Sequence, residues 1–324
     1  MLIKLGEVPP TTATHHWADY VELLALTNLD GEFSRDDLLE RWKGQDDIAA
    51  PAETLDDDDP PLLPSFGASK GDVDDRRRQV ADDVFAHLDY RARTFDAAYP
   101  FEVHTGSLGR LRRRRASKRR QLYVFLLLAS SLRNVPIKRR SSFTSPFERL
   151  AAEVLRAWLP KGAEVHPFGT GDSRSRYRGT MWQKLETLSS DLNERIGVDE
   201  SSFAPTDTGD LGLDVVAWLP LGDTEPSLPV WFAQVTCQKD WKAKQYESGK
   251  AWESYLSMRA PRGNLLFVPY CFRDAAGRWY DPKWPVAAVV LDRQRVLWLL
   301  RAAKSIKSIP YELITEIMRF REAA

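Results

Sequence analysis

The stretch GDLGLDVVAWLP, residues 209–220, is followed by VWFAQVTCQKDW, residues 230–241, and these two stretches decide the fold. The first contains the run VVAW and the second the run VWFA, and both runs are typical of a buried β-strand. Residues 220–229 between them contain glycine and several prolines, so we expect a hairpin turn there. Buried strands carry few polar groups, yet Asp214 begins the first strand and Gln234 interrupts the second. In a hairpin, these two side chains lie near each other at one end of the pair.

Asp214 and Gln234 carry oxygen atoms of the kind that hard divalent cations prefer. A carboxylate, an amide carbonyl, the backbone carbonyl of Val235 and several waters together suit Mg²⁺, which takes an octahedral shell of oxygens. A nearby lysine can orient a water or stabilise charge that develops on a phosphate. The pattern therefore predicts a Mg²⁺ site, which Mn²⁺ can also fill, close to the end of this strand pair.

The segments on either side predict an α/β fold. Residues 145–160 and 179–197 have the apolar spacing and end signals of helices, and residues 240–258 are expected to be helical despite a glycine. Residues 264–272 and 286–292 are apolar runs that indicate two more buried strands. The order of helices and strands favours a mixed sheet with helices on its faces.

The rest of the chain predicts a mainly helical N-terminal domain in front of this sheet. The expected division is an N-terminal helical segment at 1–43, an acidic flexible linker at 44–75, a helical region with a basic run at 76–140, and the α/β domain at 141–324. The linker prediction depends on its richness in Asp, Pro, Gly and Ala.

Charge is distributed unevenly, although the net charge is zero. Residues 46–59 contain seven acids and no base, and residues 110–120 contain eight bases and no acid. Basic residues at this density release counterions when they contact nucleic acid phosphates. The residues expected to make such contacts are Arg112, Arg113, Arg114, Arg115, Lys118, Arg119 and Arg120. Two other readings stay open: a disordered loop, or a partner for the acidic linker within the same chain.

Composition excludes several other classes. The two cysteines, Cys237 and Cys271, have no CxxC partner, so neither a zinc pattern nor a disulfide framework is indicated. No apolar window is long enough to span a bilayer, and we expect a cytoplasmic protein without membrane contact. The chain has neither a GxxxxGK[ST] loop nor a GxSxG elbow.

Taken in order, FERLAAEVL, GDLGLDVVAW and FAQVTCQKDW resemble the core of the PD-(D/E)XK, or restriction-endonuclease-like, nuclease superfamily. The resemblance covers about residues 141–292 and implies a mixed sheet flanked by helices. It implies that Asp214 is the principal metal ligand and Gln234 the second ligand. Glu148 is then the helix carboxylate, which binds a metal-bound water or a second metal. The superfamily places a lysine two residues after the second ligand, where this chain has Thr236. We therefore expect Lys239 to take the role of that lysine.

The resemblance implies a Mg²⁺-dependent endonuclease that cleaves DNA and leaves a 5′-phosphate and a 3′-hydroxyl. It also implies a bacterial restriction or antiphage-defence setting, with a partner protein or a homodimer. A second hypothesis stays open because Thr236 occupies the lysine position. In that hypothesis the domain is a nuclease-like fold, catalytically weak or inactive, that binds nucleic acid or a partner protein.

Overall fold

The computed structural model divides the chain into two compact units. It describes residues 3–5, 9, 13–43, 70–104, 109–169, 175–238, 240–281, 283 and 287–321. Within these limits unit 1 comprises Met1–Arg140, Tyr270–Pro282 and Pro310–Ala324, and unit 2 comprises Ser141–Pro269 and Lys283–Ile309. Unit 2 begins at the expected residue, 141. The division differs from the predicted one in that two later segments, 270–282 and 310–324, belong to unit 1.

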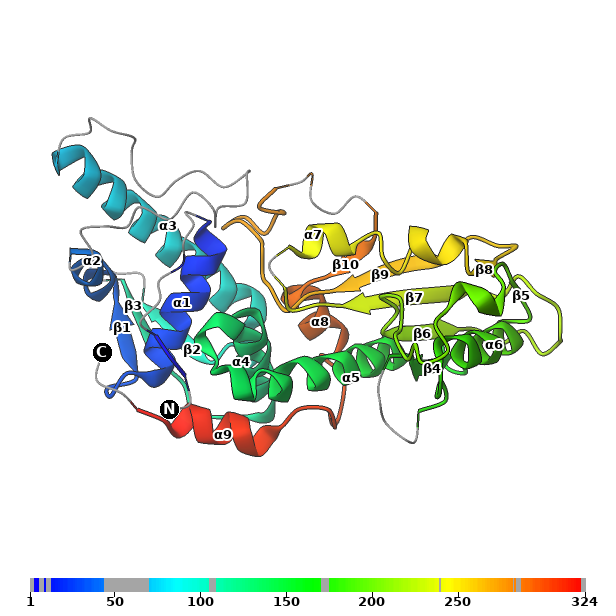
Figure 1. Cartoon of the computed structure of the whole chain (residues 1–324). Coiled ribbons are helices and arrows are strands. Elements are labelled where there is room, and N and C mark those ends of the chain that lie inside the picture. The colour runs from blue at the N-terminus through cyan, green and yellow to red at the C-terminus, as the bar shows by residue number, and fades with distance from the viewer. Residues whose placement is uncertain are drawn as a thin grey trace. The chain divides into compact units, whose positions relative to one another are not determined.

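Unit 2 contains a five-stranded mixed sheet in the order β10-β9-β7-β6-β4 (Figure 1). Its strands are β4 (Glu164–Pro167), β6 (Val215–Trp218), β7 (Val230–Val235), β9 (Gly263–Phe267) and β10 (Val289–Leu291). Strand β6 is antiparallel to both β4 and β7, while β9 is parallel to both β7 and β10. The predicted hairpin and the predicted α/β class with a mixed, helix-flanked sheet are thus confirmed.

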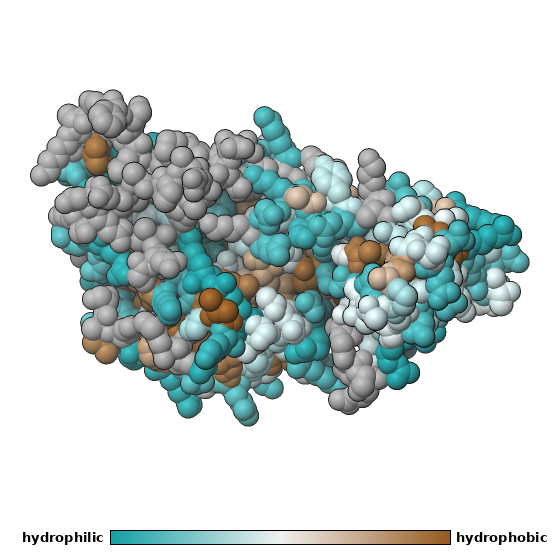
Figure 2. Space-filling model, in the orientation of Figure 1, coloured by the Kyte–Doolittle hydropathy of each residue, from teal (hydrophilic) through white to brown (hydrophobic). Residues whose placement is uncertain are grey.

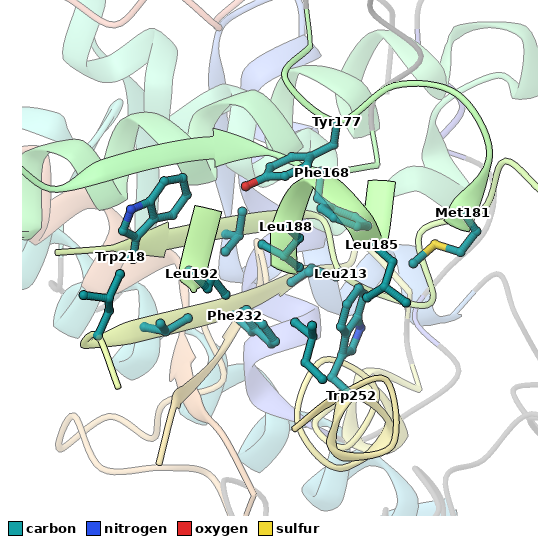
Figure 3. Close-up of a cluster of buried hydrophobic side chains, with 14 residues drawn as sticks. Phe168, Tyr177, Met181, Leu185, Leu188, Leu192, Leu213, Trp218, Phe232 and Trp252 are labelled. Atoms are coloured by element: carbon teal, nitrogen blue, oxygen red, sulfur yellow. The ribbon is translucent and has the colours of Figure 1, made fainter. Parts of the chain in front are cut away.

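Helices cover the sheet on both faces. The helices of unit 2 are α5 (Ser141–Trp158), α6 (Met181–Leu192), α7 (Trp241–Lys244) and α8 (Arg293–Leu299), and a small separate sheet pairs β5 (Arg195–Ile196) with β8 (Leu256–Ser257). Leucines of α6 pack on Val216 and Phe232, and Figure 3 shows Leu185 and Leu188 in this buried cluster. Because side chains alternate along a strand, Val215 points to the face opposite Val216. Helix α5 also contacts β4, β6 and β7.

The first helix of unit 2 is longer than its sequence pattern predicts. It begins at Ser141 rather than near 145, and Pro146 lies inside it. Phe143 and Phe147 are both almost fully buried and are four residues apart, so they lie on the same helix face. The apolar stripe of α5 therefore continues on the N-terminal side of the proline and keeps this turn packed.

The long helix expected over 240–258 does not form. The structure has the short α7, turns, a 3-10 segment at Lys250–Glu253 and then β8. Gly249, with φ −90° and ψ −93°, is not helical, and a Cβ there would lie 2.7 Å from Nδ2 of Asn264. Ser248 donates a hydrogen bond to Oδ1 of the same asparagine at 2.8 Å. Contacts with β9 therefore override the helical pattern of this segment.

Unit 1 is mainly helical, as expected. Its elements are α1 (Thr14–Thr27), β1 (Glu32–Ser34), α2 (Arg35–Lys43), α3 (Lys70–Phe95), β2 (Phe101–His104), β3 (Arg110–Arg113), α4 (Lys118–Ser130) and α9 (Tyr311–Arg319), with 3-10 turns at Asp96–Ala98, Leu132–Asn134 and Ile137–Arg139. The helix α3 starts inside the predicted linker, whose residues 44–69 lie outside the described residues.

Arg91 forms two buried ion pairs at the centre of unit 1. Nη1 of the fully buried Arg91 lies 2.7 Å from Oδ1 of Asp19 and 2.9 Å from Oε1 of Glu22. The hydroxyls of Tyr99 and Tyr123 each donate to Glu22 at 2.9 Å. Buried charges require such partners, so removing any one member would leave an uncompensated charge in the core.

The surface mixes hydrophilic residues with small apolar patches, as Figure 2 shows for one face. Among the described residues, no helix combines the length and the apolar character needed to cross a bilayer.

Candidate metal centre

A tight turn places Asp214 directly before the first residue of β6. Leu211 and Gly212 have φ values of 52° and 75°, in the left-handed region that favours glycine. Oδ1 of Asp210 accepts a hydrogen bond from the Gly212 N–H at 3.0 Å and closes the turn. Leu213 is fully buried in the core under α6 and anchors the residue next to Asp214 (Figure 3).

The hairpin brings Asp214 next to the end of β7, where Gln234 lies. Val215 of β6 pairs with Ala233 of β7, and the N–H of Asp214 donates to the carbonyl of the same alanine at 3.0 Å. Oδ2 of Asp214 accepts a hydrogen bond from the backbone N–H of Val235 at 2.7 Å. The N–H and C=O of one strand residue point to the same side, so the carbonyl of Val235 also points toward the Asp214 strand.

Asp214 is surrounded by other acids. The pKa of its carboxyl group is raised to about 7, mainly by burial and in part by the negative charges of Glu148, Asp210 and Glu247, while the hydrogen bond from Val235 acts in the opposite direction. Burial and the charge of Asp210 also raise the pKa of Glu148, on α5. A region that concentrates carboxylates in this way favours a cation, since a positive charge would relieve their mutual repulsion.

Gln234 places an unsatisfied oxygen in this region. The residue is 5% exposed, and its Nε2 donates to Oε2 of Glu247 at 2.5 Å. Its Oε1 is buried and has no hydrogen-bond partner among the described residues. A buried polar atom without a partner is costly and calls for an explanation such as an ion or a water.

Two residues that the sequence did not single out complete the surroundings of Gln234. Nζ of Lys244 lies 2.7 Å from Oε1 of Glu247, so an ion pair supports the carboxylate that holds the amide. Lys244 and Glu247 are three residues apart, a spacing that along a helix indicates an ordinary solvated pair. The contact of Glu247 with Gln234 depends on how the chain folds back after β7, and no local pattern predicts it.

The predicted lysine position is occupied by Thr236. Thr236 is buried, and its hydroxyl accepts a hydrogen bond from the backbone N–H of Gln238 at 3.1 Å. Lys239 lies outside the described residues. A second lysine, Lys184 on α6, donates to the carbonyls of Thr208 and Gly209 at 2.7 and 2.9 Å and thus holds the loop before Asp210.

The donor set fits a hard divalent cation. Within the described ranges, no three His, Cys, Asp or Glu side chains are close enough together to enclose a metal by themselves. Mg²⁺ does not need such a cage, because it binds through one or two carboxylates and keeps several waters or phosphate oxygens. The carboxylate of Asp214, Oε1 of Gln234 and the carbonyl of Val235 provide oxygens for this mode, and Glu148 contributes charge nearby.

The basic run lies in unit 1, and its residues do not form one free surface. Arg112 pairs with Glu32 at 3.2 Å, and Arg114 lies 3.5 Å from Glu102. Nη1 of Arg113 donates to the carbonyl of Leu26 at 3.0 Å, so this arginine supports the fold of unit 1. The remaining basic residues, Arg115, Lys118, Arg119 and Arg120, lie just before α4 or in its first turn.

No family model, curated protein or solved structure matches this chain. The functional assignment therefore depends on the contacts and charges described above and on the order of the motifs along the chain.

Proposed function

We propose that unit 2 is a Mg²⁺-dependent nuclease domain of the PD-(D/E)XK type that hydrolyses phosphodiester bonds in DNA. One observation carries the proposal: the half-buried carboxylate of Asp214 accepts the N–H of Val235 at the end of β7, and the neighbouring Gln234 has a buried oxygen without a partner among the described residues. A carboxylate and an amide oxygen at the end of one strand pair suit a hard cation.

The order of the elements supports the same proposal. Helix α5 precedes the antiparallel strands β4, β6 and β7, and β9 then adds in parallel to β7. This is the order expected of a PD-(D/E)XK core, with α6 and β5 inserted between its first and second strands. The connection from β7 to β9 contains a short α7 in place of a longer helix.

In the proposed reaction Asp214, Gln234 and the carbonyl of Val235 hold the cation. When bound, the cation supplies a Lewis acid for the phosphate and for the attacking water. Glu148, whose pKa is raised by burial, has the chemistry of a proton acceptor for that water. Lys239 and Lys244 are the two candidates for the amine that orients the water, and separate Lys→Gln variants distinguish them.

The test is cleavage of plasmid and linear DNA by the parent chain and by Asp214→Asn, in Mg²⁺, in Mn²⁺ and in EDTA. We expect metal-dependent cutting that falls by at least about 100-fold in the variant, because a principal ligand is lost. The matched control is Asp223→Asn, which makes the same change in the exposed β6–β7 turn and should cut like the parent. Equal cutting by Asp214→Asn and the parent would show that the site assignment is wrong.

A second candidate function is a metal-independent binding module for nucleic acid or protein, which the buried Thr236 at the lysine position favours. The two candidates differ in their response to metal. A working site raises the melting temperature in Mg²⁺ or Mn²⁺ and loses that gain in Asp214→Asn, whereas a binding module shows no shift in either chain.

A further inference from the structure

The amide of Gln234 has one orientation that its surroundings favour. An amide presents a donor at one end and an acceptor at the other, and the two ends have nearly the same shape. The neighbouring group at 2.5 Å is the carboxylate of Glu247, which accepts hydrogen bonds. The Nε2 end of Gln234 therefore lies against Glu247, because a turned amide would place two acceptors in contact. The Oε1 end is left for other ligands.

Glu247 itself is held from two sides. Nζ of Lys244 binds its Oε1 at 2.7 Å, while its Oε2 takes the hydrogen bond from Gln234. On the other side lies Gly212, where a Cβ would be 2.9 Å from both Cβ and Oε2 of Glu247. Glycine at this position lets the carboxylate approach the Asp214 turn closely enough to reach the amide.

We propose that Glu247 is a positioning residue that, together with Lys244, locks the amide of Gln234 so that Oε1 serves as a ligand for the divalent cation. The inference depends on the metal-dependent function proposed above. Glu247 acts through Gln234 and is not itself counted as a ligand. Its role is to convert a side chain with two possible orientations into a fixed oxygen donor.

The experiment measures Mn²⁺ binding to the full chain without DNA, by the loss of the free-ion EPR signal, for the parent and for Glu247→Gln. A glutamine at 247 can pair with either end of Gln234, so the orientation is no longer fixed. We expect Mn²⁺ affinity to fall about tenfold, the lower end of the effect of losing an outer partner of a ligand. The control is Glu253→Gln, which removes the same charge from an exposed side chain and should bind Mn²⁺ like the parent.

The same Glu247→Gln change in a Gln234→Glu protein distinguishes a positioning role of Glu247 from a simple loss of structure or charge. A carboxylate has two equivalent oxygens and needs no orientation, so in a Gln234→Glu background the change Glu247→Gln should not weaken Mn²⁺ binding. A purely structural or long-range electrostatic role for Glu247 would weaken binding in both backgrounds. Melting curves in EDTA show whether each protein is folded before metal is added. They are measured for the parent, for Glu247→Gln, for Gln234→Glu and for the double variant.

The outcomes distinguish this inference from the proposed function. If Asp214→Asn loses Mn²⁺ binding while Glu247→Gln binds like the parent, the metal site at Asp214 is supported and the positioning role of Glu247 is overturned. The same role is overturned if Glu247→Gln weakens binding equally in both backgrounds. If the parent binds no Mn²⁺, or if Asp214→Asn binds it equally well, the proposed metal site is wrong and the inference fails with it.

Discussion

The carboxyl group of Asp214 couples proton binding to the stability of the fold. Its pKa in the folded chain is raised to about 7, mainly by burial, and the charge of Glu148 adds to this effect. An acid with a raised folded pKa binds its proton more tightly in the folded than in the unfolded chain. The contribution of this group to the free energy of unfolding is therefore complete at pH values below its pKa in the unfolded chain. It is lost as the pH rises through its pKa in the folded chain.

This linkage predicts that Asp214→Asn lacks this pH-dependent loss of stability. Without metal, the parent should lose up to about 4 kcal/mol of unfolding free energy from this group between about pH 4 and pH 7, whereas asparagine does not titrate. The variant should thus gain stability relative to the parent as the pH rises. Urea denaturation in EDTA at successive pH values measures the difference, and a pH-independent difference would contradict the raised pKa.

At the scale of elements, the turn before β6 decides whether the site assembles. Gly212 has a φ of 75° and lies against Glu247, while Gly222, in the β6–β7 turn, has a φ of 84° and nothing within 4 Å of its would-be Cβ. The two glycines have nearly the same backbone conformation and differ in what surrounds them, so they form a matched pair.

Replacing each of these glycines by alanine should separate backbone strain from displacement of Glu247. Both Gly212→Ala and Gly222→Ala should lose about 1–2 kcal/mol of stability, because a side chain disfavours the left-handed conformation. Gly212→Ala should also push Glu247 away from Gln234 and weaken Mn²⁺ binding about tenfold. Urea denaturation and Mn²⁺ titration measure the two effects. Equal Mn²⁺ affinity in the two variants would mean that the contact with Glu247 is unimportant.

At the scale of the whole molecule, the net charge of zero gives no general attraction to DNA. Binding must then come from local groups of basic residues. In the basic run the structure separates arginines that are paired within unit 1, such as Arg112, from the exposed Arg115 and Lys118 next to α4.

The double variant Arg115→Gln/Lys118→Gln should bind duplex DNA more weakly than the parent. If each residue contacts one phosphate, the slope of log affinity against log salt should fall by about 2, since each contact contributes about 0.9. Arg112→Gln, which removes an arginine paired with Glu32, is the control and should change the slope less. Fluorescence anisotropy in EDTA measures binding without cleavage. An unchanged slope in the double variant would remove this region from the DNA contact.

The sequence by itself determined the α/β class and the β6–β7 hairpin. Strand periodicity and turn residues are local signals, and a hairpin joins neighbours in the chain, so its register follows from a short stretch. Only the tertiary structure decided that residues 240–258 leave the helical pattern, that Glu247 and Lys244 hold Gln234, and that 270–282 and 310–324 belong to unit 1. These features depend on contacts between residues distant in sequence, such as Gly249 with Asn264, whose energies outweigh the local preference of either segment.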